Sequence, residues 1–411
     1  MHIGLAIVGG ITLLPLAPVV YLLMWLYLAA QYQRAQTLER SILGLKIGSF
    51  FGYWWKSVVF GLIVGIILSG GIYLVRHYFL FDWPAALSWQ LWALLVVLLL
   101  IDVRLADIAY AGPLLIALIF IMSIIPNFHY PWQLSDNQMR SLLLVTGGAQ
   151  LLSGLLEILN WGQMSSPIFV QSRRGQVVGM FVIQAFRPIP LLLPYFGALM
   201  PVAVFTGISG YTLSSENRRL MRMKGLAIAL TGLLVLAGAI FWGTGITGLL
   251  VTAVVPLLLR IGLLNVLQLL DKDDLPIYVR PARGVRALAT LDHSPARQLG
   301  IQPGEIIVKI GNIPVNSPYD IHFAIDQNPA YVKLEVVDMR GESRFIGTPI
   351  FADGPSQLGV IVVPDEHLHQ YREVYEMGRW NWIWRWWAKN PSKSKKSYQR
   401  TTIASRENQT M

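Results

Sequence analysis

Seven apolar stretches of sixteen or more residues dominate the first 270 positions of the chain. A helix needs about 20 predominantly apolar residues to cross a hydrocarbon layer of ~30 Å. Stretches near this length predict a polytopic α-helical membrane bundle over residues 1–270. The predicted spans are Ala6–Ala30, Val58–Val75, Ala86–Ile101, Ile108–Ile125, Ser141–Leu159, Gly225–Trp242 and Ile246–Leu269.

The basic residues beside these stretches predict how the bundle is oriented. Cytoplasmic loops of membrane proteins carry an excess of lysine and arginine. No basic residue precedes the first stretch, whereas Arg34, Arg40, Lys46 and Lys56 follow it. This asymmetry predicts seven spans with the N-terminus outside. An eight-span alternative with both termini inside stays open, and both arrangements place the C-terminal region in the cytoplasm.

Residues 177–210 are apolar but do not fit the helical pattern. Each proline removes a backbone N–H donor and disrupts a helix. Irregular backbone at membrane depth is tolerated only where protein or water satisfies its polar groups. We therefore expect a re-entrant or interfacial segment with irregular backbone instead of a span. Its charged and helix-breaking residues are Arg187, Pro188, Pro190, Pro194 and Pro201.

Two charged residues lie within the apolar stretches. Glu157 is close to the end of one stretch, and Arg260 lies in the middle of another. Intramembrane charges are costly and often mark a proton or substrate pathway. The structural alternatives are a Glu–Arg pair that holds the bundle together, or side chains that reach toward the interface. The structural alternatives are favoured because so few such charges occur.

Composition supports the membrane assignment and divides the chain into three parts. Hydrophobic residues make up 54% of the 411 residues and charged residues only 14%, against about a quarter in soluble proteins. The net charge of +10 combines +8 for residues 1–270, −5 for residues 271–377 and +7 for residues 378–411. The basic residues are dispersed and no nucleic-acid-binding motif occurs, so no nucleic-acid partner is expected.

The sequence shows no catalytic or metal-binding constellation. The chain has no cysteine, and none of its seven histidines lies in an apolar stretch or has the His-Glu-x-x-His spacing of a metalloprotease. Ser209 has no membrane histidine to act as its base. His367 and His369 lie in a stretch typical of a solvated turn. We therefore expect no enzymatic activity, no metal and no cofactor.

The pattern changes from helical to alternating after residue 271. We expect helices after Ser294 and over Tyr319–Asp326. The chain also carries the motif Ser294-Pro295-Ala296, Gly300-Ile301 and Gly304-Glu305-Ile306-Ile307. Strands are expected at Val285–Leu291, Ile306–Ile310, Ile313–Val315, Val332–Met339 and Ser343–Thr348. This order resembles bacterial PDZ domains over residues 284–364, which implies a small α+β PDZ domain within a cytoplasmic region at 271–377.

PDZ domains bind an extended peptide as an added strand and hold its carboxylate in a backbone nest. The resemblance implies a circularly permuted order with the pairing strand last. The match to the nest and that strand is Gln357, Leu358, Gly359, Val360, Ile361 and Val362. The helix across the groove would contribute Tyr319, His322, Phe323 and Asp326. The alternative is that Leu358 and Val360 are ordinary core residues and Gly359 is a bulge.

Residues 378–411 form a tryptophan-rich, basic tail. Tryptophans and neighbouring cations suit the lipid headgroup layer, so we expect the tail to contact the membrane interface. Packing of the tryptophans on the PDZ domain is the alternative. Residues 391–411 are polar and are expected to be disordered. The tryptophans are Trp380, Trp382, Trp384, Trp386 and Trp387.

Several spans followed by a C-terminal PDZ domain resemble the MinJ family of topological determinants of cell division in Gram-positive bacteria. The resemblance covers most of the chain, although the first 140 residues match mainly in hydropathy and the tail does not match. It implies a multi-pass protein of the bacterial cell membrane, at the septum and poles, that bridges the scaffold DivIVA and the MinC–MinD inhibitor. The similar segments are Ser166–Gly175, Arg187–Pro190, Pro276–Val279 and Val332–Val336.

Two other functions stay open from the sequence. One is a PDZ adaptor that regulates a membrane protease or the secretion machinery through the same groove. The other is a small-molecule transporter with an accessory PDZ domain. Transporters commonly contain internal repeats and paired broken helices. Only one broken segment and no clear repeat occur here, which argues against transport.

Overall fold

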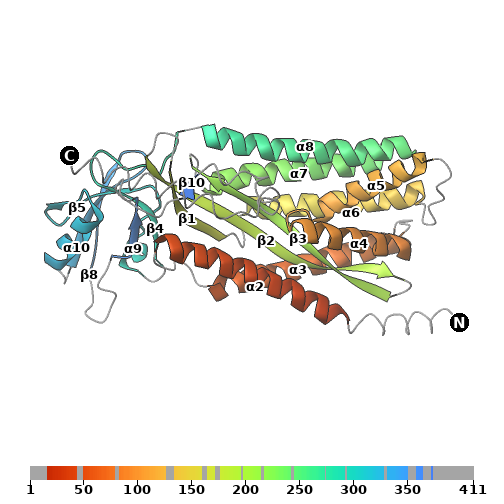
Figure 1. The fold of residues 1–411 in the computed structure, drawn as a ribbon, viewed down its shortest axis with the longest axis horizontal. Helices are drawn as coiled ribbons and strands as arrows, with labels where there is room; N and C mark the ends of the chain where they lie inside the picture. Colours follow the sequence, from red (N-terminus) through yellow and green to blue (C-terminus); the bar gives the residue numbers. More distant parts are fainter. Residues whose placement is uncertain are drawn as a thin grey trace, which may run out of the picture.

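The computed structural model describes residues 16–43, 50–78, 83–125, 134–159, 164–171, 176–195, 198–213, 217–241, 245–273, 275–291, 294–327, 331–349, 358–363 and 372–373. Long helices run side by side along the molecule, and a long β-hairpin runs with them (Figure 1). A second sheet with two short helices lies at one end, next to strand β1 (Met164–Gln171) (Figure 1). The tail tryptophans and Gln357 lie outside the described residues.

The helices of the bundle overlap all seven apolar stretches. In the described part of the chain, four helical segments are long and apolar enough to cross a membrane, namely Trp54–Tyr73, Asp136–Ile158, Arg218–Phe241 and Ile246–Asp271. The protein is therefore a membrane protein, while the seven-span count and the side of the N-terminus stay predictions. The helices are α2 (Leu16–Leu43), α3 (Phe50–Tyr78), α4 (Ala85–Ile101), α5 (Ile108–Ile124), α6 (Asp136–Ile158), α7 (Asn217–Phe241) and α8 (Ile246–Asp273).

Glycines let the backbones of α6 and α7 approach closely. A Cβ atom added at Gly154 would overlap the backbone of Ala229, and one added at Gly232 would lie 2.6 Å from the backbone nitrogen of Leu151. Small residues at helix contacts are typical of membrane bundles, because lipid supplies no hydrophobic drive for helix association and close packing must do so. Met221 and Ile228 of α7 share a buried cluster with Ile183 and Ile208 of the β-hairpin.

The predicted re-entrant segment is a regular antiparallel hairpin. Strands β1 (Met164–Gln171), β2 (Val177–Tyr195) and β3 (Ala198–Thr212) form a sheet in the order β10-β1-β2-β3, with the two-residue β10 (Arg372–Glu373) parallel to β1. The absence of helix at 177–210 agrees with the sequence analysis. The expected irregular backbone does not occur, because β2 and β3 pair without interruption from Phe181–Thr212 to Tyr195–Ala198.

The prolines leave this pairing intact because of where their nitrogens point. Alternate residues of a strand direct their backbone groups to opposite edges. The Leu192 N–H points away from β3 and donates to the Ser69 hydroxyl on α3 at 3.0 Å. Pro188, Pro190 and Pro194 share this alternation, so they remove only donors that the ladder does not use.

The outer edge of β3 follows the same rule. Phe205 N–H points away from β2 and donates to the carbonyl of Ala106, in the α4–α5 connection, at 2.8 Å. Pro201 shares the alternation of Phe205 on this strand. All four prolines therefore occupy positions that face outward from the β2–β3 pair, where an amide without a partner would be costly in lipid.

Helix α3 packs its backbone directly against the proline edge of β2. Gly61, Gly65 and Ser69 recur every four residues and therefore share one face of the helix. Cβ atoms added at the two glycines would overlap the carbonyl oxygens of Pro188 and Pro190. The small residues thus admit β2 to the helix surface, and the serine supplies the acceptor that Leu192 needs.

The PDZ domain follows the predicted order of elements. Its sheet runs β8-β7-β5-β4-β9, with β6 paired to β5. The core combines side chains of these strands with the buried face of α10. The elements are β4 (Val285–Thr290), α9 (Pro295–Gln298), β5 (Ile306–Ile310), β6 (Ile313–Pro314), α10 (Pro318–Gln327), β7 (Tyr331–Val337), β8 (Ser343–Pro349) and β9 (Val360–Val362).

Candidate peptide-binding site

Strand β9 is the end strand of the described PDZ sheet, as the sequence analysis required of a ligand-pairing strand. It pairs antiparallel with β4 through Val360 and Val362, opposite Thr290 and Ala287. Its opposite edge has no further strand among the residues that the structure describes. A peptide could therefore add to this edge by main-chain hydrogen bonds.

Gly359 holds the turn into β9 in a conformation that favours glycine. Its φ is +72°, in the left-handed region that L side chains rarely adopt. A Cβ atom at this position would overlap Cβ of Ser294, the residue that caps α9. Leu291 N–H donates to the Gly359 carbonyl at 2.8 Å, and Ala296 N–H donates to the Leu358 carbonyl at 3.0 Å. The predicted nest is thus tied to the start of α9.

The side chains of the predicted site face different surroundings. Leu358 and Val362 are buried in the PDZ core, which they share with Ile321, Ala324 and Ile325 of α10. The other predicted residues of α10 are exposed on a different face of this helix. These exposed residues are Tyr319, His322, Phe323 and Asp326. The structure therefore brings β9 into one core with the buried face of α10, and a binding role for the exposed face stays a prediction.

The opposite face of β9 contacts the membrane domain, which sequence reasoning missed. Ile361 and Val363 are buried in a cluster with Phe169, Val177 and Phe181 of β1 and β2. The sequence signal was the unbroken apolar run from Val360 to Val363, because strands buried on both faces lack polar alternation. Here one face packs on the PDZ core and the other on the membrane-domain sheet.

Tyr278 joins the two sheets at this contact. Its ring meets that of Phe181 edge to face with centroids 5.0 Å apart, and its carbonyl accepts from Gly179 N–H at 2.8 Å. Ile277 N–H donates to the carbonyl of Leu213, just beyond β3, at 2.9 Å. We call the set Phe169, Val177, Phe181, Tyr278, Ile361 and Val363 the interdomain joint.

The motif that identifies the domain stabilises its fold. Glu305 is buried, accepts from Gln302 N–H at 3.0 Å and pairs with Arg344 at 2.8 Å.

At the start of α10, the Asp320 carboxylate accepts from the backbone N–H groups of Asn316 and Ser317 at 2.8 and 2.9 Å. Of these bonds, the one from Asn316 contributes most to lowering the pKa of Asp320.

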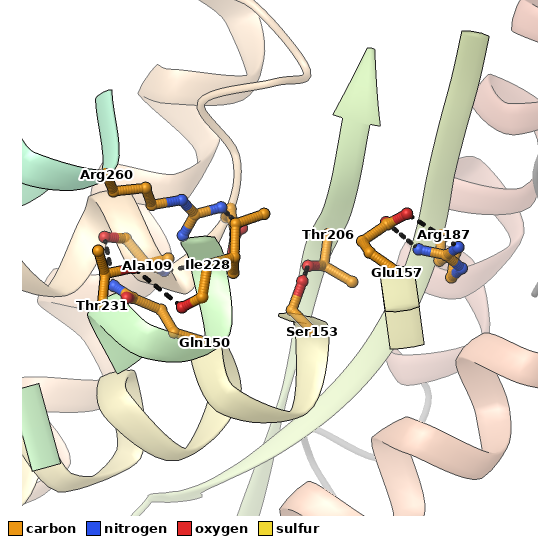
Figure 2. Close-up of polar contacts among 10 residues, drawn as sticks. Ala109, Gln150, Ser153, Glu157, Arg187, Thr206, Ile228, Thr231 and Arg260 are labelled. Atoms are coloured by element: carbon orange, nitrogen blue, oxygen red, sulfur yellow. Dashed lines mark hydrogen bonds and ion pairs between the residues drawn. The ribbon is translucent and has the colours of Figure 1, made fainter. Parts of the chain in front are cut away.

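Glu157 and Arg260, the two charged residues of the apolar stretches, each form an ion pair, but not with each other. Figure 2 shows Glu157 of α6 paired with Arg187 of β2, both fully buried. Arg260 of α8 instead pairs with Asp107, which caps α5, at 3.1 Å. Both contacts join separate elements, in accord with the structural alternative. Among the described residues no group of His, Asp or Glu side chains could hold a metal.

A smaller set of polar contacts continues along α6 between these two pairs. Ser153 and Thr206 hydroxyls lie 2.6 Å apart, and the Gln150 side chain donates to the carbonyl of Ala109 at 3.3 Å (Figure 2). Gln150, Ser153 and Glu157 follow a helical spacing of three and four residues, so they share one face of α6. This face links α6 to the hairpin and to α5.

Comparison with known proteins agrees with the fold. The sequence pattern of the family described as PDZ domain matches residues 290–337. The chain is 26% identical over 265 residues to the probable cell division topological determinant MinJ of Lacticaseibacillus paracasei, covering 57% of this chain and 68% of the relative. It is 33% identical over 143 residues to the cell division topological determinant MinJ of Bacillus subtilis (strain 168), covering 34% of each. The predicted resemblance is confirmed, and the chain is a MinJ-like membrane protein with a PDZ domain.

Proposed function

We propose that this protein is a non-enzymatic membrane scaffold that recruits division proteins through its PDZ domain. The observation that carries the proposal is the position of β9, an end strand of a PDZ sheet whose adjoining turn is held by Gly359. The names of the relatives support a role in cell division. The interdomain joint supports a scaffold, because it fixes the pairing strand to the membrane domain.

The geometry defines how a peptide would bind. Side chains of an added strand alternate between the two faces of the sheet. One set would lie on the α10 side, where Tyr319 and Phe323 are exposed at 74% and 46%. The other set would lie on the side of β1 and β2. A terminal carboxylate would be received at the turn formed by Leu358 and Gly359, as in the nest predicted from the sequence.

We infer the finer role from the resemblance to the MinJ family. The PDZ domain would lie in the cytoplasm and bridge a DivIVA-like scaffold to a MinC–MinD-like inhibitor. The protein would then be concentrated at the septum and poles. Each partner would need an extended segment that can pair with β9.

The test uses the full-length protein in its native membrane. The variant Tyr319→Ala/Phe323→Ala removes exposed aromatic area from α10. Phe345→Ala is the matched control, since Phe345 is 64% exposed on β8 at the other end of the same sheet. After crosslinking, co-purification of DivIVA and MinC–MinD should fall at least about fivefold in the double variant only, a loss of ~1 kcal/mol.

Gly359→Glu tests the nest separately, with its melting temperature measured first. Septal and polar foci of a fluorescent fusion should become even membrane staining in both groove variants. Unchanged capture of both partners by a folded Gly359→Glu protein would contradict use of the groove. Even staining of the wild-type protein would instead favour an adaptor for a protease or secretion machinery.

A further inference from the structure

Three arginines are exposed together at the start of helix α7. Arg218, Arg219 and Arg222 all point away from the bundle, although the helix they begin is apolar enough to cross a membrane. Among the residues that the structure describes, none forms an ion pair with these guanidinium groups. Lys224 differs, because it is buried and donates to the Gln268 side chain at 2.7 Å.

An apolar stripe continues from the arginines along the same side of α7. Leu226, Leu230 and Leu233 are 53%, 49% and 47% exposed. A helix turns about 100° per residue, so these positions lie within the angular sector of the three arginines. Leu220 and Met221 lie on the opposite side and are buried. The outward surface of α7 is therefore cationic in its first turns and apolar in the turns that follow.

The cationic end lies on the same side of the membrane domain as the PDZ domain. Helix α7 follows β3, and Leu213 at the end of β3 accepts a hydrogen bond from Ile277 of the PDZ segment. Figure 1 shows this end of α7 directed toward the PDZ domain. The arginines thus lie at the border of an apolar span, at the level expected for lipid headgroups.

We propose that Arg218, Arg219 and Arg222 bind the phosphate headgroup of an anionic phospholipid, whose acyl chains lie along Leu226, Leu230 and Leu233. Guanidinium groups match phosphate oxygens in a bidentate geometry. Basic residues at a membrane surface favour anionic over zwitterionic lipid, because the zwitterionic headgroup carries a compensating cation. The stripe of leucines distinguishes a lipid from a soluble phosphate. This site does not depend on the peptide groove.

Native mass spectrometry of the full-length protein in detergent tests the site. The probes are phosphatidylglycerol, phosphatidylcholine with the same acyl chains, and glycerol phosphate. The variant is Arg218→Gln/Arg219→Gln/Arg222→Gln. The matched control is Arg283→Gln/Arg297→Gln/Arg340→Gln, which removes the same charge from exposed positions of the PDZ domain. A conservative variant carries lysine at all three α7 positions.

Phosphatidylglycerol should bind the wild-type and control proteins alike and bind the α7 variant roughly one hundredfold more weakly, at about fivefold per arginine. The lysine variant should keep most of the binding, because it keeps the charge. Equal retention by the glutamine variant, equal binding of phosphatidylcholine, or displacement of the lipid by equimolar glycerol phosphate would each overturn the proposal. If the triple variant unfolds, Arg222→Gln alone decides: a fivefold loss supports the site and no loss overturns it.

Discussion

The outer edges of the two sheets differ in whether their backbone groups have partners within the chain. In the membrane domain, both outer edges of the β2–β3 pair carry prolines or amides bonded to neighbouring elements. In the PDZ domain, β9 ends the described sheet with ordinary valine and isoleucine residues at the edge. The outer edges of the β2–β3 pair therefore cannot accept a further strand, whereas the outer edge of β9 can.

We infer that the difference follows from the solvent, with the β2–β3 pair at membrane depth, as predicted from the sequence, and β9 in water. A backbone N–H that faces lipid has no water to bond, so leaving it without a partner is costly. In water the same group is satisfied by solvent and can exchange that bond for one to a peptide. An edge in lipid therefore has to be sealed within the chain, whereas an edge in water can serve as a recognition surface.

The largest expected effect comes from breaking the sealed edge at α3. Gly61→Leu places a side chain where the carbonyl of Pro188 lies, so either strand or helix must move. We expect a loss of more than about 3 kcal/mol in unfolding free energy, measured in detergent. Gly70→Leu on the same helix is the control, because open space surrounds Gly70. Equal stability of the two variants would contradict the α3–β2 packing.

The interdomain joint connects the sheet of the membrane domain to the sheet of the PDZ domain. Weakening this joint should cause the second-largest loss of unfolding free energy. Tyr278→Ala removes a buried ring that packs on Phe181. We expect a loss of about 2 to 3 kcal/mol, since the joint can partly collapse into the space. Hydrogen exchange at Val360–Val362 should accelerate. Tyr319→Ala, at an exposed tyrosine, should leave that exchange unchanged; similar exchange in both variants would mean that β9 is stabilised without the joint.

The prolines show how far the sequence could predict the membrane domain. Pro188, Pro190, Pro194 and Pro201 correctly excluded a helix at 177–210. Whether a proline breaks or protects a strand depends on which way its nitrogen points, and that is set by pairing with the partner strand. The alternation of Pro188 and Pro190 was the available signal for a strand edge. The ion-pair partners of Glu157 and Arg260 likewise depended on contacts between distant segments.

The PDZ elements were predictable because their signals are local. Ser294 caps α9, and Gly300 and Gly304 adopt positive φ at the turns where the motif places them. Strand β5 at Ile306–Ile310 has the predicted bounds. The contact of Ile361 with the membrane domain was not predicted, because a single apolar run does not specify which surface will cover it.

A smaller effect tests the hydrogen bond that seals β2. Ser69→Ala removes the acceptor for Leu192 N–H and leaves a donor without a partner against α3. We expect a loss of about 1 to 2 kcal/mol in unfolding free energy. Ser123→Ala is the control, because the exposed Ser123 hydroxyl bonds only a carbonyl of its own helix in the described contacts. Equal values for the two variants would show that the Leu192 amide finds another acceptor.

The smallest expected effect is a difference in pH dependence between a hydrogen bond in the PDZ domain and one in the membrane domain. Asp320 satisfies backbone N–H groups at the start of α10 with a carboxylate, whereas Ser69 satisfies Leu192 with a hydroxyl that does not titrate. The folded pKa of Asp320 is lowered, chiefly by the N–H of Asn316. Its stabilisation is therefore complete above the unfolded value of about 3.9 and is lost as pH falls through the lower folded pKa.

Because Asp320 is largely solvated, Asp320→Asn should cost at most about 0.5 kcal/mol at neutral pH. The difference from wild type should shrink toward zero as pH falls below about 4, since the wild-type carboxylate then becomes neutral as well. The cost of Ser69→Ala should stay constant over the same range. A pH-dependent cost of Ser69→Ala would mean that a titratable group also accepts hydrogen bonds at the β2 edge. The two sheets would then differ in which groups bond their edge amides, and not in whether lipid or water surrounds those edges.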